Sequence, residues 1–135
     1  MDQQKYIDGL KEIDSDIERR SQLDEKLSDK EKKQLRSVCG QLLWATSQTR
    51  PDAAYESCRL SNYGKEATVR ALLDANKVIR KVKSMHVKIV FPGLGDPCAT
   101  NATHGASQGA SIVFLSGNNR VVPISWNWRE LPSLL

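Results

Sequence analysis

Basic side chains gather between residues 65 and 88, and their spacing is typical of a surface that binds phosphate groups. This segment holds seven basic and two acidic residues, a net charge of +5, whereas residues 1–31 hold six basic and ten acidic residues, a net charge of −4. Helical spacings of seven and four residues place side chains on one stripe. A solvated helix surface gives the same pattern, so nucleic-acid binding and plain solvation both remain open. The candidate binding residues are Arg70, Lys77 and Lys81 along the stripe, with Arg80 and Lys83 beside it.

Few other residues have the types and spacing that catalysis or metal binding requires. Asp96 is an isolated carboxylate in a Gly-Asp-Pro turn, and one carboxylate does not make a two-metal site. His86 and His104 lack a partner at metal-ligand spacing. Cys98 with His104 as its base would lack a third group to orient the histidine. The sequence therefore predicts no catalytic residue, no metal site and no cofactor.

Cysteine use and hydropathy limit the cellular compartments in which the chain is expected. The three cysteines, Cys39, Cys58 and Cys98, are spaced by 19 and 40 residues, which matches no zinc pattern. Free thiols favour a reducing, intracellular location, either cytoplasmic or nuclear. Hydrophobic residues make up 39% of the chain and charged residues 27%, and no apolar run reaches the roughly 20 residues of a membrane helix. A folded chain without a membrane partner is expected.

Helices are expected to position the basic stripe. Ser28–Glu31 has the form of a capping box, which predicts a helix start. Pro51 suits the first turn of a second helix, because it has no amide proton to leave unpaired. In the clearest pattern, Val69 and Ile79 lie on an apolar face opposite the basic one, and Trp44 is also expected in the core. The expected helices span about 29–46, 51–61 and 65–84, preceded by a short helix at 3–13 and an exposed connector at 14–27.

The period of the sequence changes after residue 85. Residues 86–91 are rich in Val, Ile and Phe and favour a strand, and residues 92–109 have the Pro, Gly, Ala, Ser and Thr content of a loop. Two further strands are predicted at 110–115 and 120–126. The Ser-Gly-Asn-Asn sequence between them is a good hairpin signal.

Residues 35–52 form the most distinctive run in the chain, LRSVCGQLLWATSQTRPD. This run resembles the block that follows the polymerase core in the polyproteins of copia-type LTR retrotransposons, where Gly-Gln-Leu-x-Trp-x-x-x-Gln-Thr-Arg-Pro-Asp recurs. The matching residues here are Gly40, Gln41, Leu42, Trp44, Gln48, Thr49, Arg50, Pro51 and Asp52. The resemblance covers about residues 3–128. Outside the run above, the similar segments are parts of 65–81, Phe91–Gly95, Gly105–Gly109, Ile112–Leu115 and Pro123–Trp126.

The departures from that family bear on activity. Its ribonuclease H domain cleaves RNA with carboxylates that hold two Mg²⁺ ions. The first of these is an Asp at the end of the first strand, and this chain has Asn101 at that position. An amide carries no charge to neutralise a divalent ion. The first strand is expected to be missing, and the later carboxylates have no counterpart. The resemblance therefore implies a non-catalytic chain, although the parent family is an RNA-directed DNA polymerase and ribonuclease H.

The expected fold is α+β, a small helical bundle followed by a few antiparallel strands that resemble an incomplete ribonuclease H sheet. The expected segments are a charged helix and connector at 1–28, a helical part resembling a thumb or connection domain at 29–84, and a strand segment at 85–135. Thumb helices of reverse transcriptases grip the template–primer backbone, so the resemblance favours duplex or RNA–DNA hybrid as the partner of the five basic residues. Two alternatives stay open: a structural or protein-interaction remnant with no nucleic-acid role, and a residual metal-dependent ribonuclease H.

Overall fold

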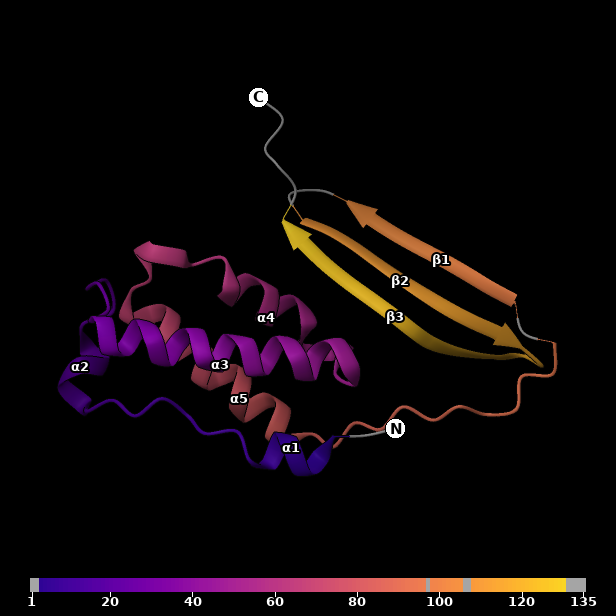
Figure 1. Cartoon of the computed structure of the whole chain (residues 1–135), viewed down its shortest axis with the longest axis horizontal. Helices are drawn as coiled ribbons and strands as arrows, with labels where there is room; N and C mark the ends of the chain where they lie inside the picture. The colour runs from indigo at the N-terminus through magenta and orange to yellow at the C-terminus, as the bar shows by residue number, and fades with distance from the viewer. Residues whose placement is uncertain (1–2, 97, 106–107, 131–135) are drawn as a thin grey trace. The chain divides into compact units, whose positions relative to one another are not determined.

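The computed structural model describes residues 3–96, 98–105 and 108–130 of the chain (Figure 1). The chain divides into two compact units. The helical unit comprises residues 3–87, and the sheet unit comprises the described residues from Lys88 onward. The combination of helices with an antiparallel sheet confirms the expected α+β class.

Helices build the first unit, and local signals in the sequence set where they begin. Ser28 Oγ accepts the N–H of Glu31 at 3.3 Å, and the Glu31 carboxylate accepts the N–H of Ser28 at 2.8 Å, so the predicted capping box is confirmed. The last helix begins at Val69, later than predicted, because a 3₁₀ turn and an extended N-cap at Thr68 precede it. The elements are α1 (Gln4–Asp8), α2 (Ile17–Ser21), α3 (Asp29–Gln48), η1 (Pro51–Ala53), α4 (Ala54–Ser61), η2 (Gly64–Glu66) and α5 (Val69–Ser84).

The apolar faces of α3 and α5 form the core of the helical unit. Leu42 in α3 and Leu72 and Ile79 in α5 are completely buried. Full burial of such a side chain contributes roughly 1.5–3 kcal/mol. The apolar face predicted for α5 from the helical spacing is thus confirmed, and it leaves the basic side of that helix directed away from the core.

A buried amide holds the N-terminal segment on α5. The Asn76 side chain donates to the carbonyl of Ile13 at 2.8 Å and accepts the N–H of Ile13 at 2.8 Å. The helix expected at 3–13 ends at Asp8, where Gly9 caps it. The residues that follow continue without regular structure, so the Asn76 amide takes the place of helical hydrogen bonds at Ile13.

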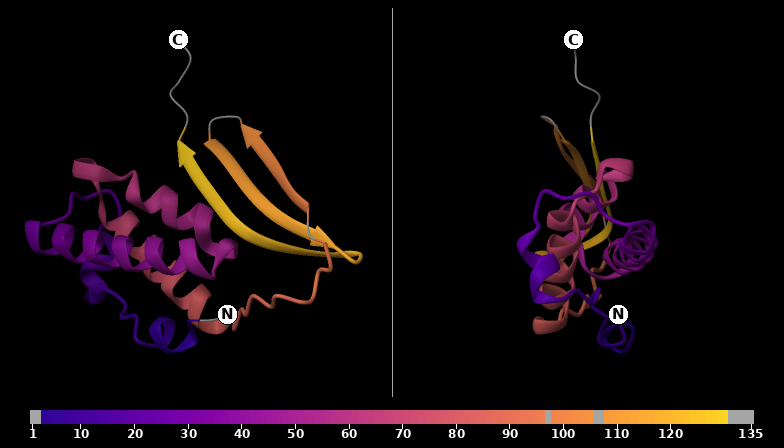
Figure 2. Two further views of the ribbon diagram at one scale, coloured as in Figure 1. Left: turned by 45° about the vertical axis from the view of Figure 1, so that its right-hand side comes forward. Right: turned by 90° about the vertical axis from the view of Figure 1, so that its left-hand side faces the viewer.

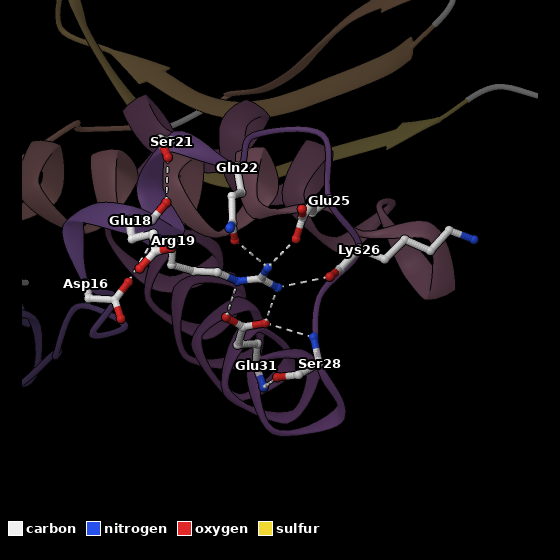
Figure 3. A network of polar contacts seen from close by, with 9 residues as sticks. All are labelled: Asp16, Glu18, Arg19, Ser21, Gln22, Glu25, Lys26, Ser28 and Glu31. Carbon is white, nitrogen blue, oxygen red and sulfur yellow. Dashed lines mark hydrogen bonds and ion pairs between the residues drawn. The ribbon is translucent and has the colours of Figure 1, made fainter.

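Residues 14–27 were expected to be an exposed connector, but Arg19 anchors this charged segment to α3 by hydrogen bonds (Figure 3). Its guanidinium donates to the Glu31 carboxylate at 3.0 and 2.9 Å, to Glu25 at 2.9 Å and to the carbonyl of Lys26 at 3.0 Å. The hydrogen bonds from Arg19 lower the pKa of Glu31 from its ordinary 4.5 to about 2. The backbone N–H of Val69 also donates to the carbonyl of Glu25 at 3.0 Å. This segment therefore closes over the start of α5.

Three antiparallel strands in the order β1-β2-β3 form the sheet unit (Figure 2). They are β1 (Cys98–Gly105), β2 (Gln108–Gly117) and β3 (Arg120–Glu130). Asn118 and Asn119 join β2 to β3 with φ values of 50° and 56°. Two successive residues with positive φ are typical of a type I′ turn, so the predicted hairpin is confirmed.

Two predictions about strands are wrong. Residues 86–91 have no regular secondary structure, whereas residues 98–105, inside the expected loop, form β1. The Ala, Thr, Asn and Gly residues of β1 show no apolar alternation, and their strand conformation depends on pairing with β2. Asn101 lies within β1, opposite Val113 of β2.

Candidate nucleic-acid interface

The five predicted phosphate-binding residues all lie on α5, which defines the α5 basic face. Arg70, Lys77, Arg80 and Lys83 are exposed and Lys81 is half-buried. The opposite side of the helix is in the core. The helical stripe expected from the sequence is thus present as a surface.

Carboxylates from the acidic N-terminal segment face two of these cations. Arg70 pairs with Asp24 at 3.2 Å, and Arg80 approaches Glu12 at 3.8 Å. Both acids belong to the segment whose net charge is −4. The difference in charge between the two segments was visible in the sequence, but their pairing depends on the packing of residues 10–27 against α5.

Two more cations of the α5 basic face have partners on α5 itself or on a nearby helix. Lys77 pairs with Asp74 on the same helix at 3.4 Å. Lys81 donates to Glu56 on α4 at 2.5 Å and to the backbone carbonyl of Asp52 at 3.1 Å. Lys83 has no such partner among the described residues. Most of the charge on this face is therefore compensated within the helical unit.

A hollow of about 200 Å³ lies between α4 and α5, next to the basic face. Its charged lining combines three cations with two carboxylates, and the Tyr63 hydroxyl donates to Asp74 at 3.3 Å. Opposite charges at this spacing cancel much of each other's field, so the hollow offers little attraction to an anion. Its polar lining residues are Glu56, Arg59, Tyr63, Asp74, Lys77 and Lys81.

The exposed side of α3 carries cations that lack carboxylate partners. Lys33, Gly40 and Trp44 follow one stripe of the helix, at spacings of seven and four, and Arg36 lies beside it. Lys33 and Arg36 are exposed and have no ion pair with another described residue. A Cβ atom added at Gly40 would meet nothing within 4 Å, so no packing contact requires a glycine there. We call these four residues the α3 open face.

Trp44 lies on the surface, and the prediction that it belongs to the core is wrong. It is 50% exposed, and its ring packs on that of Tyr6, with 4.7 Å between the centroids and 60° between the planes. The Tyr6 hydroxyl donates to the carbonyl of Gln41 at 3.4 Å. The α3 open face thus ends in a pair of aromatic rings that solvent can reach.

Arg50 was not predicted to have a role, and it is fully buried. Its guanidinium donates to the Asp52 carboxylate at 2.9 and 2.8 Å and to the carbonyl of Val82 at 2.5 Å. Val82 is in the last turn of α5, where carbonyls lack helical partners and a cation is favoured. The Thr-Arg-Pro-Asp part of the motif therefore joins the corner between α3 and α4 to the C-terminal end of α5.

The catalytic and metal candidates do not come together among the described side chains. Asp96, His86 and Cys98 are exposed, as is Asn101 within β1, and the side chain of His104 lies outside the described residues. In the part of the chain that the structure describes, no group of three or more His, Cys, Asp or Glu side chains could hold a metal ion. The described helices include none that is long and apolar enough to cross a membrane.

Comparison with known proteins adds no family to this picture. No family model, no curated protein and no solved structure matches the chain. The resemblance to copia-type polyproteins therefore rests on the residues of the motif itself.

Proposed function

We propose that this chain is a non-catalytic remnant of a copia-type reverse transcriptase–ribonuclease H region, and that its helical unit binds the nucleic-acid backbone without sequence preference. One observation carries the binding part of the proposal: Lys33 and Arg36 on α3 and Lys83 on α5 are exposed cations without a carboxylate partner among the described residues. An unpaired cation can contact a phosphate without first giving up an ion pair. Each such contact releases counterions, which is the main source of non-specific affinity.

The paired cations of the α5 basic face contribute less. The side chains of Arg70, Lys77 and Arg80 are 55%, 71% and 60% exposed, and exposed ion pairs are worth about 0–1 kcal/mol. A phosphate can replace their carboxylates at little cost. Lys81 is held by two oxygens and stabilises the corner between α4 and α5, so we assign it a structural role.

The aromatic pair on α3 adds a second kind of contact. Trp44 and Tyr6 present ring surface on the same side of α3 as Lys33 and Arg36. Stacking of a base on an aromatic side chain contributes about 1–3 kcal/mol. We therefore expect tighter binding to a duplex or hybrid with a single-stranded end than to a blunt duplex.

Two charge-matched variants test which helix binds. Lys33→Gln/Arg36→Gln and Arg70→Gln/Lys77→Gln each remove two positive charges, the first pair from α3 and the second from α5. Binding of labelled blunt duplex, hybrid and overhang oligonucleotides is measured by fluorescence anisotropy over a range of salt concentrations. We expect wild-type dissociation constants of about 10⁻⁴–10⁻⁶ M and a log–log salt slope of about −0.9 per phosphate contacted. The α3 variant should lose the larger part of the affinity and of the slope.

Two results would contradict the proposal in different ways. Equal losses in both variants would show attraction to net charge without a preferred site. Absence of wild-type binding at low salt would favour the second candidate, a structural or protein-interaction remnant. That candidate has its own support, because four of the five cations of the α5 basic face already pair with carboxylates of the helical unit.

A further inference from the structure

Strand β1 has one edge that no other described strand covers. It pairs with β2 along residues 98–105, and it is the outer strand in the order β1-β2-β3. The side chains of Cys98 to Thr103 are exposed. Alternate backbone N–H and C=O groups on the outer edge of such a strand point away from the sheet and can pair with another strand.

The two outer strands of the sheet differ in how they resist such pairing. β3 contains Pro123, which has no N–H to donate, and a register irregularity lies opposite it between Val113 and Phe114. β3 also begins with the charged Arg120. Prolines, bulges and charges are the usual features that protect an edge strand. The sequence of β1, CATNATHG, contains no proline, lysine, arginine or carboxylate.

From these features we infer that β1 is a self-association edge, which pairs antiparallel with β1 of a second copy of this chain. The absence of charged residues means that two copies meet without like-charge repulsion at the strand. The short Ala, Thr and Asn side chains at 99–103 leave the backbone edge accessible over its central residues. Antiparallel pairing about a two-fold axis uses the same strand on both copies and closes the assembly at two.

The pairing has a testable register. With the two-fold axis through residue n, that residue lies opposite its own copy, and n−1 lies opposite n+1. Opposite residues of an antiparallel pair have Cα atoms about 4.5–5.5 Å apart, which is close enough for a disulfide. Only one position near the centre of β1 can therefore form an efficient disulfide with itself.

The first experiment measures association of the full chain and of two charge-matched variants. Sedimentation velocity is recorded from about 1 mM down to about 1 µM, the range of weak association. Thr100→Lys/Ala102→Lys places charges on β1, and Ser125→Lys/Asn127→Lys places the same charges at the same spacing on β3. We expect a wild-type dimer, a β1 variant whose dissociation constant rises about tenfold or more, and a β3 variant that dimerises as the wild type does. A wild-type monomer throughout, or greater sensitivity to the β3 variant, overturns the inference.

The second experiment stands even if the β1 lysine variant fails to fold. A Cys58→Ser/Cys98→Ser background retains the buried Cys39. One cysteine at a time is added to it at 99, 100, 101, 102 or 103, each variant is oxidised, and the covalent dimer is quantified against the background without an added cysteine. One dominant position supports the antiparallel pair. Equal cross-linking at all five positions indicates parallel stacking of many copies and overturns the inference, as does the absence of cross-linking at every position.

Discussion

Arg50 and Asp52 form a pair whose two members should respond very differently to mutation. The Arg50 side chain is completely buried, whereas the Asp52 side chain is 26% exposed. Neutralising the aspartate leaves a buried cation without its counter-charge. Replacing the arginine leaves a carboxylate that water can reach. The perturbations we compare are Asp52→Asn and Arg50→Met, the latter chosen because Met approximates the length of the Arg stem.

The magnitudes follow from these contacts. Removing one partner of a buried ion pair costs about 3–5 kcal/mol when the remaining charge is uncompensated. We expect a loss in that range for Asp52→Asn, since Arg50 keeps only the Val82 carbonyl and an amide oxygen as acceptors. Arg50→Met leaves the Val82 carbonyl unpaired, at a cost of about 1–3 kcal/mol. The double variant should cost less than the sum of the two, with a coupling energy in the range of about 0.5–3 kcal/mol.

The assay is urea unfolding followed by far-UV circular dichroism, which reports on the helical unit. The wild-type chain, both single variants and the double variant are compared at neutral pH. Because single domains are stable by only about 5–15 kcal/mol, Asp52→Asn should shift the unfolding midpoint clearly. The reasoning fails if Arg50→Met is the more damaging change, or if both single variants unfold within about 1 kcal/mol of the wild type.

Four further predictions concern other parts of the chain. The pKa of Glu31 is lowered to about 2, so its ionised carboxylate adds at most about 3 kcal/mol to the free energy of unfolding. This stabilisation is present above pH 4.5 and is lost as the pH falls from 4.5 to 2, so Glu31→Gln should flatten the acid unfolding curve in that window. Asn76→Leu removes both hydrogen bonds to Ile13, and limited proteolysis should then cut near that residue before the helices unfold. Gly40→Ala should raise the free energy of unfolding by up to about 1 kcal/mol, measured in urea, because an added Cβ meets no atom. Neither the wild type nor Asn101→Asp should cleave the RNA strand of an RNA–DNA hybrid in the presence of Mg²⁺, because one added carboxylate does not hold two metal ions. A gel assay of the labelled RNA strand would detect any product.

The features that sequence predicted well depend on short-range rules. The capping box of Ser28 and Glu31 needs residues three apart, and the buried faces of α3 and α5 need only helical spacing. The Asn-Asn hairpin likewise depends on two adjacent residues with positive φ. Each of these signals is complete within one segment, so no knowledge of the tertiary structure is required.

The features that sequence missed depend on distant partners. β1 is a strand because residues 108–117 pair with it, although its own composition is that of a loop. Arg70 and Arg80 meet carboxylates from residues 24 and 12, which no local pattern relates to them. The sequence therefore placed the basic residues on one side of α5 but could not show which of them stay uncompensated.

The family-like run from Gly40 to Asp52 divides into two parts with different physical roles. Its second part, around Arg50, is internal and stabilises the corner between α3, α4 and α5. Its first part is on the surface, where a glycine in mid-helix costs roughly 1 kcal/mol relative to alanine and a half-exposed tryptophan leaves apolar area in water. A Cβ atom at Gly40 would meet nothing within 4 Å, and Trp44 remains half exposed although its ring packs on Tyr6 of α1. Residues that break a local stability rule without an internal compensation are expected where another molecule makes contact. The open glycine, the exposed ring of Trp44 and the unpaired Lys33 and Arg36 share this one side of α3, which is why the proposed nucleic-acid contact is assigned there first and to α5 second.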